Sequence, residues 1–322
     1  MNTQQQVIQG GFVVIGNVLD FRISLPVELV SDLRIERPND AQLKTIHELI
    51  SSTLPGHNSR NDFETRWEPG PAPDSWLPIP LPREEWRYSI LTFAGNGLSA
   101  HTFLDAARLV EPGLFWLAIA HTSEPFGGGA KMGWSIDSLG AHRRLFYAKP
   151  PGDRLPELLD ELALDRLRLS YLRFKALDRD AHPGIHRAIE LFSLFNRLPL
   201  ANFLDVLAMF MLIEMLLTHN PGDREVGDSL NHQIGAKVPF VFGRIGVPID
   251  YSCFEDAAPK KIWSRLYDYR SAVAHGDQPD FKNRLRILKN AATAHEFLET
   301  VTRRLLRHAL DDPDLFEGLK PV

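Results

Sequence analysis

Hydrophobic and polar positions change their pattern about halfway along the chain. Residues 1–149 contain short apolar runs between Gly and Pro residues, a pattern typical of strands. Residues 154–318 repeat their apolar positions with a helical period almost throughout. Between them, the run Ala148–Asp153 holds two Pro and one Gly, which suits a domain boundary. The pattern predicts an α+β, β-rich N-terminal domain over 1–149, followed by an all-α helical bundle over 154–318.

In the first half, a helix should begin at Asn39 or Asp40, since either side chain can cap it. A second helix is expected over Ser99–Leu109. The expected strands are Phe12–Ile15, Val18–Leu25, Trp86–Phe93 and Leu114–His121, with short edge strands at Trp134–Ile136 and Leu145–Tyr147. Seven prolines between residues 55 and 85 predict a long irregular loop, because proline cannot donate to a strand ladder.

In the second half, six helices separated by Pro and Gly describe a bundle. They are expected at Pro156–Arg179, Gly184–Asn196, Leu200–His219, Gly227–Phe242, Pro259–His275 and Phe281–Leu310. The most apolar run, Phe203–Leu217, is shorter than the ~20 residues that cross a bilayer, and it contains Asp205 and Glu214. We therefore expect a buried helix there and no membrane partner.

The composition narrows the class of protein further. The chain has 322 residues, of which 44% are hydrophobic and 24% charged, so wholesale disorder is excluded. Cys253 is the only cysteine, which rules out an intramolecular disulfide and a zinc site built on cysteines. No targeting segment is visible, and we expect a cytoplasmic protein. No metal or cofactor is expected either, because the pair His182 and His186 lacks a third ligand in a known pattern.

The best candidate chemistry lies at the end of the helix expected over 259–275. Gly276 stands just past that end, where a left-handed backbone is needed, and His275 lies in the last turn. Arg270 precedes His275 by five residues, which separates the two by about 140° around the helix. These residues allow two interpretations. One is a capping histidine with an arginine paired to a carboxylate such as Asp268; the other is a catalytic pair that meets in a shared cleft.

The string YDYRSAVAHG at 267–276 resembles the RS-x-x-x-HG helix end of the Apea-like branch of the HEPN superfamily. The upstream run Ile213–Leu217 is similar to the earlier family helix that bears a Glu-x-Leu, here with Glu214. The resemblance covers about residues 185–310. More loosely, the first half resembles the β-rich domains that precede Apea-like HEPN domains. The resemblance implies an all-α HEPN bundle in the second half of the chain.

Many HEPN proteins are metal-independent endoribonucleases that act as dimers, so the resemblance implies RNA as substrate and a homodimer. Histidine is the side chain best suited to proton transfer near neutral pH, which makes His275 the candidate for that step, and Arg270 offers a permanent forked charge to phosphate oxygens. Ser271 could donate a hydrogen bond to phosphate, although other HEPN branches often have Asn, Asp or His there. Tyr267, Asp268 and Glu214 are expected to support the site. If Glu214 is buried near Arg270, it is either a structural partner of that arginine or, as the resemblance implies, the residue that orients it. Family analogy alone suggests phage defence or toxin-like growth arrest.

Residues 260–289 hold eight Lys or Arg and three Asp, an excess of +5 in a protein of net charge −5. Such a patch would attract a polyanion, or it is simply a solvated surface of two helices. The RNA-binding candidates are Lys260, Lys261, Arg265, Lys282, Arg284 and Arg286. The alternative function is a non-catalytic HEPN module that binds RNA, a nucleotide or a protein partner.

Tryptophans surround the proline-rich segment at positions 67, 76 and 86. They could form a surface on which bases stack. More often such aromatic residues anchor a loop to its own domain, and we favour that interpretation.

Overall fold

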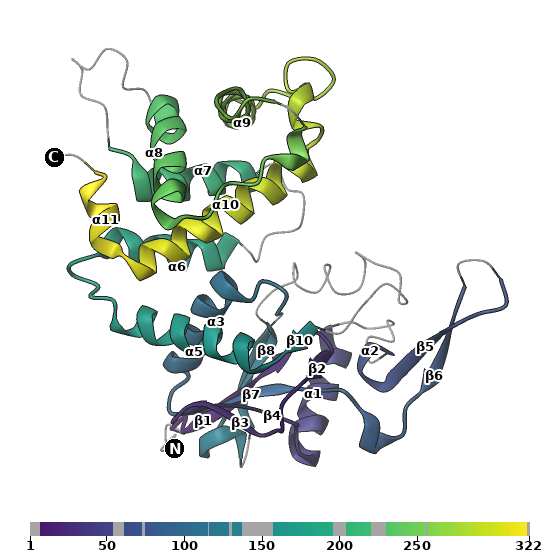
Figure 1. Cartoon of the computed structure of the whole chain (residues 1–322). Coiled ribbons are helices and arrows are strands. Elements are labelled where there is room, and N and C mark those ends of the chain that lie inside the picture. The colour runs from purple at the N-terminus through teal and green to yellow at the C-terminus, as the bar shows by residue number, and fades with distance from the viewer. Residues whose placement is uncertain are drawn as a thin grey trace. The chain divides into compact units, whose positions relative to one another are not determined.

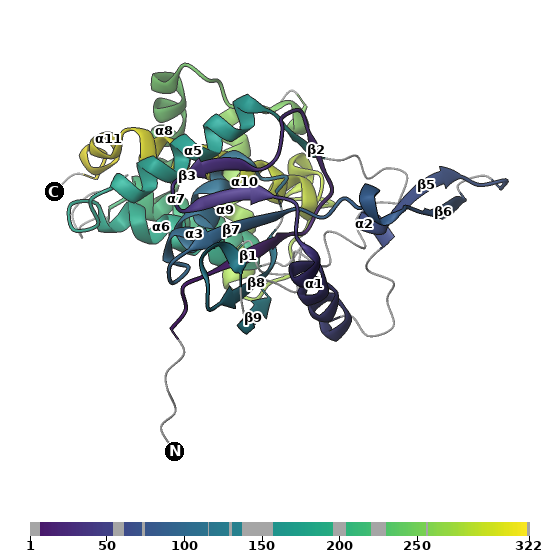
Figure 2. The same cartoon turned by 90° about the horizontal axis from the view of Figure 1, so that it is seen from below.

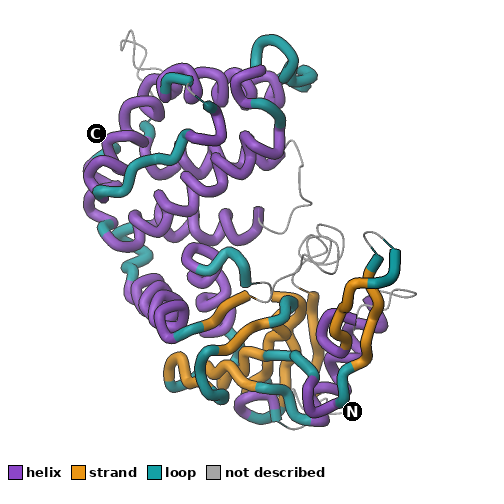
Figure 3. Tube along the Cα trace, turned by 45° about the vertical axis from the view of Figure 1, so that its right-hand side comes forward, coloured by secondary structure: helices purple, strands orange, loops and turns teal. Residues whose placement is uncertain are grey.

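The computed structural model describes residues 7–53, 61–72, 75–114, 116–128, 131–136, 157–195, 204–219, 230–255 and 257–320. Its contacts divide the chain into unit 1, Met1–Leu172, and unit 2, Arg173–Val322. The boundary predicted at Ala148–Asp153 lies outside the described residues, as does the edge strand predicted at Leu145–Tyr147. A β-rich unit followed by a helical unit confirms the coarse prediction of an α+β half and an all-α half (Figure 3).

Unit 1 is built on a six-stranded antiparallel sheet of order β3-β4-β7-β1-β8-β9. Its strands are β1 (Gly10–Ile15), β3 (Val27–Val30), β4 (Leu33–Glu36), β7 (Ile90–Ala94), β8 (Trp116–Thr122) and β9 (Lys131–Ile136). A short parallel pair joins β2 (Leu19–Phe21) to β10 (Glu157–Leu159). The predicted central strands and the edge position of β9 are confirmed, while β3, β4 and β10 were not predicted.

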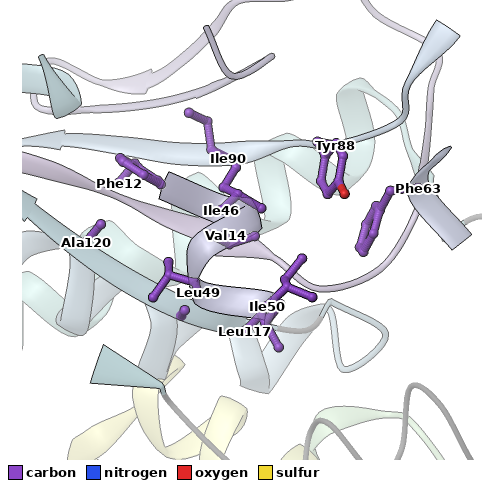
Figure 4. Packing of buried hydrophobic residues seen from close by; sticks show 11 residues of the cluster. Phe12, Val14, Ile46, Leu49, Ile50, Phe63, Tyr88, Ile90, Leu117 and Ala120 are labelled. Atoms are coloured by element: carbon purple, nitrogen blue, oxygen red, sulfur yellow. The ribbon is translucent and has the colours of Figure 1, made fainter. Parts of the chain in front are cut away.

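Helices cover both faces of this sheet. They are α1 (Asp40–Thr53) on one face, and α3 (Leu98–Val110) with α5 (Glu161–Ala176) on the other (Figures 1 and 2). Asn39 caps α1 as predicted, because its side chain accepts from the Gln42 amide while the Gln42 side chain accepts from the Asn39 amide. Residues of α1 then pack on β1 and β7, and the rings of Phe63 and Tyr88 stack beside them (Figure 4).

The prediction of an irregular loop over residues 55–85 is wrong for its described part. The short helix α2 (Asn61–Glu64) leads into a two-stranded ribbon of β5 (Thr65–Pro69) and β6 (Trp76–Pro80). The Gly70 amide donates to the Ser75 carbonyl, so the next pair, Pro69 with Trp76, exchanges no backbone hydrogen bond. The other strand prolines fall on pairs of the same kind, where their missing N–H costs nothing.

Unit 2 is a bundle around one buried helix. Its helices are α6 (Pro183–Phe195), α7 (Leu204–Leu217), α8 (Leu230–Ile245), α9 (Pro259–Ala274), α10 (Ala291–Asp311) and α11 (Pro313–Gly318). Helix α7 is buried on almost every side and packs against α6, α8, α9 and α10, as its apolar run predicted. The helix predicted from Phe281 begins only at Ala291, because Lys289 has a φ of +62° and Asn290 caps the new helix.

Candidate active site

Helix α9 carries the Arg-to-His motif, and its end has the geometry that the sequence predicts. Gly276 has a φ of +77°. Its amide donates to the Val273 carbonyl at 3.1 Å, and the Asp277 amide donates to the Ala272 carbonyl at 2.8 Å. These two bonds form a Schellman motif, which satisfies carbonyls that the helix end would otherwise leave open. The chain therefore makes a sharp turn immediately after His275, and the His275 side chain is exposed.

Arg270 lies at the edge of the buried face of α9 and points toward α7. One of its terminal nitrogens is 3.6 Å from Oε1 of Glu214, and the two side chains are 30% and 18% exposed. The guanidinium carbon is also 5.7 Å from the centre of the Tyr267 ring, a cation–π contact. That ring meets Phe210 of α7 edge-on. Packing of α9 on α7 thus places three of the predicted site residues, Glu214, Tyr267 and Arg270, side by side.

The Glu214–Arg270 pair is close but poorly hydrogen-bonded. Oε1 of Glu214 and Nε of Arg270 are both buried, and neither has a hydrogen-bond partner in the described part of the chain. Burial raises the pKa of the Glu214 carboxyl, and the nearby positive charge of Arg270 opposes that rise. Because their mutual contact is this loose, Arg270 retains bonding capacity that an anion could use.

Asp268 takes no part in the Glu214–Arg270 pair. Its two carboxylate oxygens accept from Arg265 at 2.5 Å and from Arg284 at 2.6 Å. Arg270 therefore pairs with Glu214 and not with Asp268, because a rotation of about 200° along α9 separates the side chains of Arg270 and Asp268. The interpretation of a capping histidine with an arginine paired to a carboxylate stays open, with Glu214 as that carboxylate. Arg265 and Arg284 are RNA-binding candidates, and this shared carboxylate partly neutralises both.

His275 and Ser271 lie on the solvent side of α9. The Ser271 carbonyl accepts the His275 amide at 3.1 Å, and the Ser271 side chain is partly exposed. Within the described residues, no hydrogen bond or ring contact joins His275 to Arg270. A single chain therefore does not bring the two motif residues together, in agreement with their angular separation of about 140°.

The remaining basic candidates are solvent-exposed. Lys260 and Lys261 lie on the first turn of α9, whereas Lys282 and Arg286 lie on the connection that precedes α10. None of these four side chains forms an ion pair with a described carboxylate. Because α10 begins later than expected, Lys282, Arg284 and Arg286 do not lie in an α-helix. They lie in turns and in a short 3₁₀ segment, Arg286–Leu288.

Sequence reasoning missed a second polar cluster behind α9. Tyr269 is 3% exposed, and burial together with the nearby charge of Asp205 raises its pKa to about 12. On α10, His295 lies 3.7 Å from Asp205 and 3.5 Å from Glu299. In the sequence, Asp205 is visible only as a charged residue within an apolar run. Its partners Tyr269 and His295 lie about 60 to 90 residues away, so no local pattern predicts the cluster.

The described residues contain no group of three or more His, Cys, Asp or Glu side chains arranged to hold a metal ion. None of their helices is both long and apolar enough to cross a membrane. No family model, curated protein or solved structure matches the chain. The similarity to HEPN domains therefore rests on the residues of α7 and α9 and stays a prediction.

Proposed function

We propose that this protein is a metal-independent endoribonuclease of the HEPN type, with Arg270 and His275 as its catalytic residues. One observation carries the proposal. Arg270 is held at the rim of the bundle by a carboxylate that does not saturate it, while His275 stands exposed at the end of the same helix. An arginine kept only for stability would more commonly be fully hydrogen-bonded.

RNA supplies the nucleophile for the proposed reaction. The ribose 2′-oxygen attacks the adjacent phosphorus, the bond from phosphorus to the 5′-oxygen breaks, and the products end in a 2′,3′-cyclic phosphate and a 5′-hydroxyl. His275 transfers the proton that leaves the 2′-hydroxyl or the one that the 5′-oxygen gains. Arg270 stabilises the negative charge on the phosphate oxygens, and Ser271 donates a hydrogen bond to one of them.

Glu214 acts in this proposal as a positioning residue for Arg270. Its 3.6 Å contact is longer than a hydrogen bond, so the guanidinium can turn its fork toward a phosphate while the carboxylate still anchors it. Tyr267 limits the rotation of Arg270 from the other side through its ring face.

A homodimer completes the proposed site. Arg270 and His275 diverge around α9, so one copy makes a poor clamp on a phosphate. Two antiparallel copies of α9 about a two-fold axis would place an Arg and a His from each chain around one cleft. The four exposed basic side chains near α9, Lys260, Lys261, Lys282 and Arg286, would then hold the RNA backbone.

The test is incubation of the purified protein with total RNA in EDTA, followed by mapping of the product ends. Cleavage that leaves 2′,3′-cyclic phosphates supports the proposal. Intact RNA over a wide range of protein concentrations contradicts it and favours the non-catalytic binding module. A strong requirement for added metal ions would contradict the proposed mechanism.

Dilution and salt test the dimer and the backbone contacts. Specific activity should fall steeply below the dimer dissociation constant, and RNA binding should weaken as salt rises because phosphate contacts release counterions. A mixture of Arg270→Ala and His275→Ala chains should recover part of the activity if each site takes residues from both chains. A strict monomer that is fully active refutes the shared site.

A further inference from the structure

A cavity in unit 1 is lined by residues of α1 and of the segment before β7, and no residue of α9 lines it. It has a volume of about 520 Å³ and lies between α1 and the 3₁₀ helix η1 (Arg83–Glu85). Its α1 wall consists of Asp40, Leu43, Lys44, His47, Glu48 and Ser51, and its other wall consists of Arg83 and Trp86. The α1 residues recur every three or four positions, so they form one stripe of the helix. The volume falls within the range of ~300–1,000 Å³ typical of small-molecule sites.

The aromatic side chains that line the cavity, Trp86 and His47, are fixed by contacts within unit 1. The Trp86 indole N–H donates to the Leu81 carbonyl at 3.2 Å, and the ring packs against the buried cluster of α1, β1 and β7. This bond confirms that Trp86 anchors the proline-rich segment. His47 lies 5.6 Å from Trp86 between ring centroids, and its Nε2 is 2.8 Å from Oε1 of Glu64. Because both side chains are already fixed by these contacts, a flat ring could bind against them with little further loss of side-chain entropy.

Most of the charged side chains around the cavity already have partners. Asp40 accepts from Arg83 at 2.5 Å at one end, and Glu48 lies 3.4 Å from Lys131 of β9 at the other. Lys44 lies between these pairs on the exposed face of α1 and forms no ion pair with any described carboxylate. The cavity thus combines an aromatic wall with one cation available for an anion.

We propose that this cavity binds a flat heteroaromatic anion of mononucleotide size. The base stacks against the ring of Trp86 and meets His47, whose ring is tilted by 56° from that of Trp86, at an angle. The phosphate pairs with Lys44, within reach of the exposed Arg83. No residue of α9 lines the cavity, so binding there does not depend on whether the protein cleaves RNA.

Calorimetric titration of the full-length protein with AMP tests the proposal, with adenosine and ribose 5-phosphate as probes that lack the phosphate or the base. AMP should bind, and each truncated probe should bind at least about fivefold more weakly. Lys44→Glu should weaken AMP binding about tenfold or more, because the variant replaces an attraction by a repulsion. Lys175→Glu, an exposed lysine on α5, is the matched control and should bind AMP as the wild type does.

Trp86→Leu should also weaken AMP binding, by about fivefold or more. Because Trp86 packs on the core, AMP binding by the Trp86→Leu variant is interpreted only if its unfolding temperature stays near that of the wild type. If that temperature falls, the result for Lys44→Glu alone decides whether the proposal holds. The proposal is wrong if AMP gives no heat at millimolar concentration, or if Lys44→Glu binds AMP unchanged. It is also wrong if Arg270→Ala abolishes AMP binding while Lys44→Glu does not, since AMP then binds at α9.

Discussion

Two half-buried carboxylates, one in each unit, have opposite hydrogen-bonding environments. Glu64 of unit 1 and Glu214 of unit 2 are 19% and 18% exposed. Glu64 accepts from the Tyr88 hydroxyl at 2.8 Å and has His47 at the same distance. Glu214 has Arg270 at 3.6 Å and leaves its Oε1 without a hydrogen bond. Equal burial thus accompanies a carboxylate that accepts a hydrogen bond in unit 1 and a carboxylate oxygen without one in unit 2.

We interpret the difference as a division between polar residues that stabilise the fold and polar residues that are available for chemistry. A buried polar group that is fully bonded strengthens the fold, whereas a partly bonded one costs stability and is kept when it serves another purpose. Changes near Glu214 should therefore affect activity more than stability, and changes near Glu64 should do the reverse.

The largest effect is expected at His275. His275→Ala should lower RNA cleavage by about 10²–10⁴-fold, because the proton transfer is lost. Its unfolding temperature should stay unchanged, since the side chain is exposed and its backbone keeps the helix end. Cleavage assays and thermal melts check both parts, with the exposed His101 as the matched control through His101→Ala. Full activity in folded His275→Ala would remove His275 from the site.

Arg270→Lys should lower cleavage by at least about tenfold, although the positive charge survives. The planar fork of arginine matches two phosphate oxygens, whereas an ammonium group binds as a point charge. Arg187→Lys is the control, because Arg187 is an exposed arginine of α6 that pairs with Glu190 and has no part in the proposed site. Wild-type turnover by the Arg270→Lys variant would show that the fork is not used.

On the other side of the comparison, Glu64→Gln should destabilise the protein by about 1–3 kcal/mol, since it weakens the charged acceptor of the Tyr88 hydroxyl and removes the negative charge beside His47. Glu214→Gln, measured at the same pH by chemical denaturation, should cost less than Glu64→Gln. Equal losses for the two variants would abolish the contrast between the two units.

The pH dependence of Glu214→Gln sharpens the contrast. The folded-state pKa of Glu214 is raised above its usual 4.5 by burial. Its contribution to stability is therefore fully present below pH 4.5 and is lost as pH rises through the raised pKa. As pH rises from 4.5 through the raised pKa of Glu214, the wild type should therefore lose stability relative to the Glu214→Gln variant. Thermal melts of both proteins from pH 4 to pH 8 measure the difference, and parallel pH profiles would contradict the prediction.

The smallest effect is expected at Gly276. Gly276→Ala should destabilise unit 2 by about 1 kcal/mol, because alanine is strained at a φ of +77°. Cleavage should fall along with stability, since His275 stands immediately before this turn. Gly246→Ala, at a φ of +74° after α8, is the matched control: it should lose similar stability and keep its activity.

Local patterns were sufficient to predict much of the fold and one part of the site. The burial of α7, the Asn39 cap of α1 and the left-handed Gly276 follow from residues within a few positions of each feature. Helical periodicity, caps and turn glycines act at this range, so the sequence alone shows them. The motif on α9 is local in the same sense.

Only the tertiary structure decided which side chains meet. Asp268 pairs with Arg265 and Arg284, and not with Arg270, because α9 and the connection before α10 pack in one arrangement. The contact of Glu214 with Arg270 was expected only from the family resemblance, and it forms because α9 packs on α7. The β5–β6 ribbon likewise needed a register that puts each strand proline on a non-bonded pair. Periodicity places a side chain on a face of its own element. The partner that covers that face is chosen by packing across many residues, and no local pattern encodes that choice.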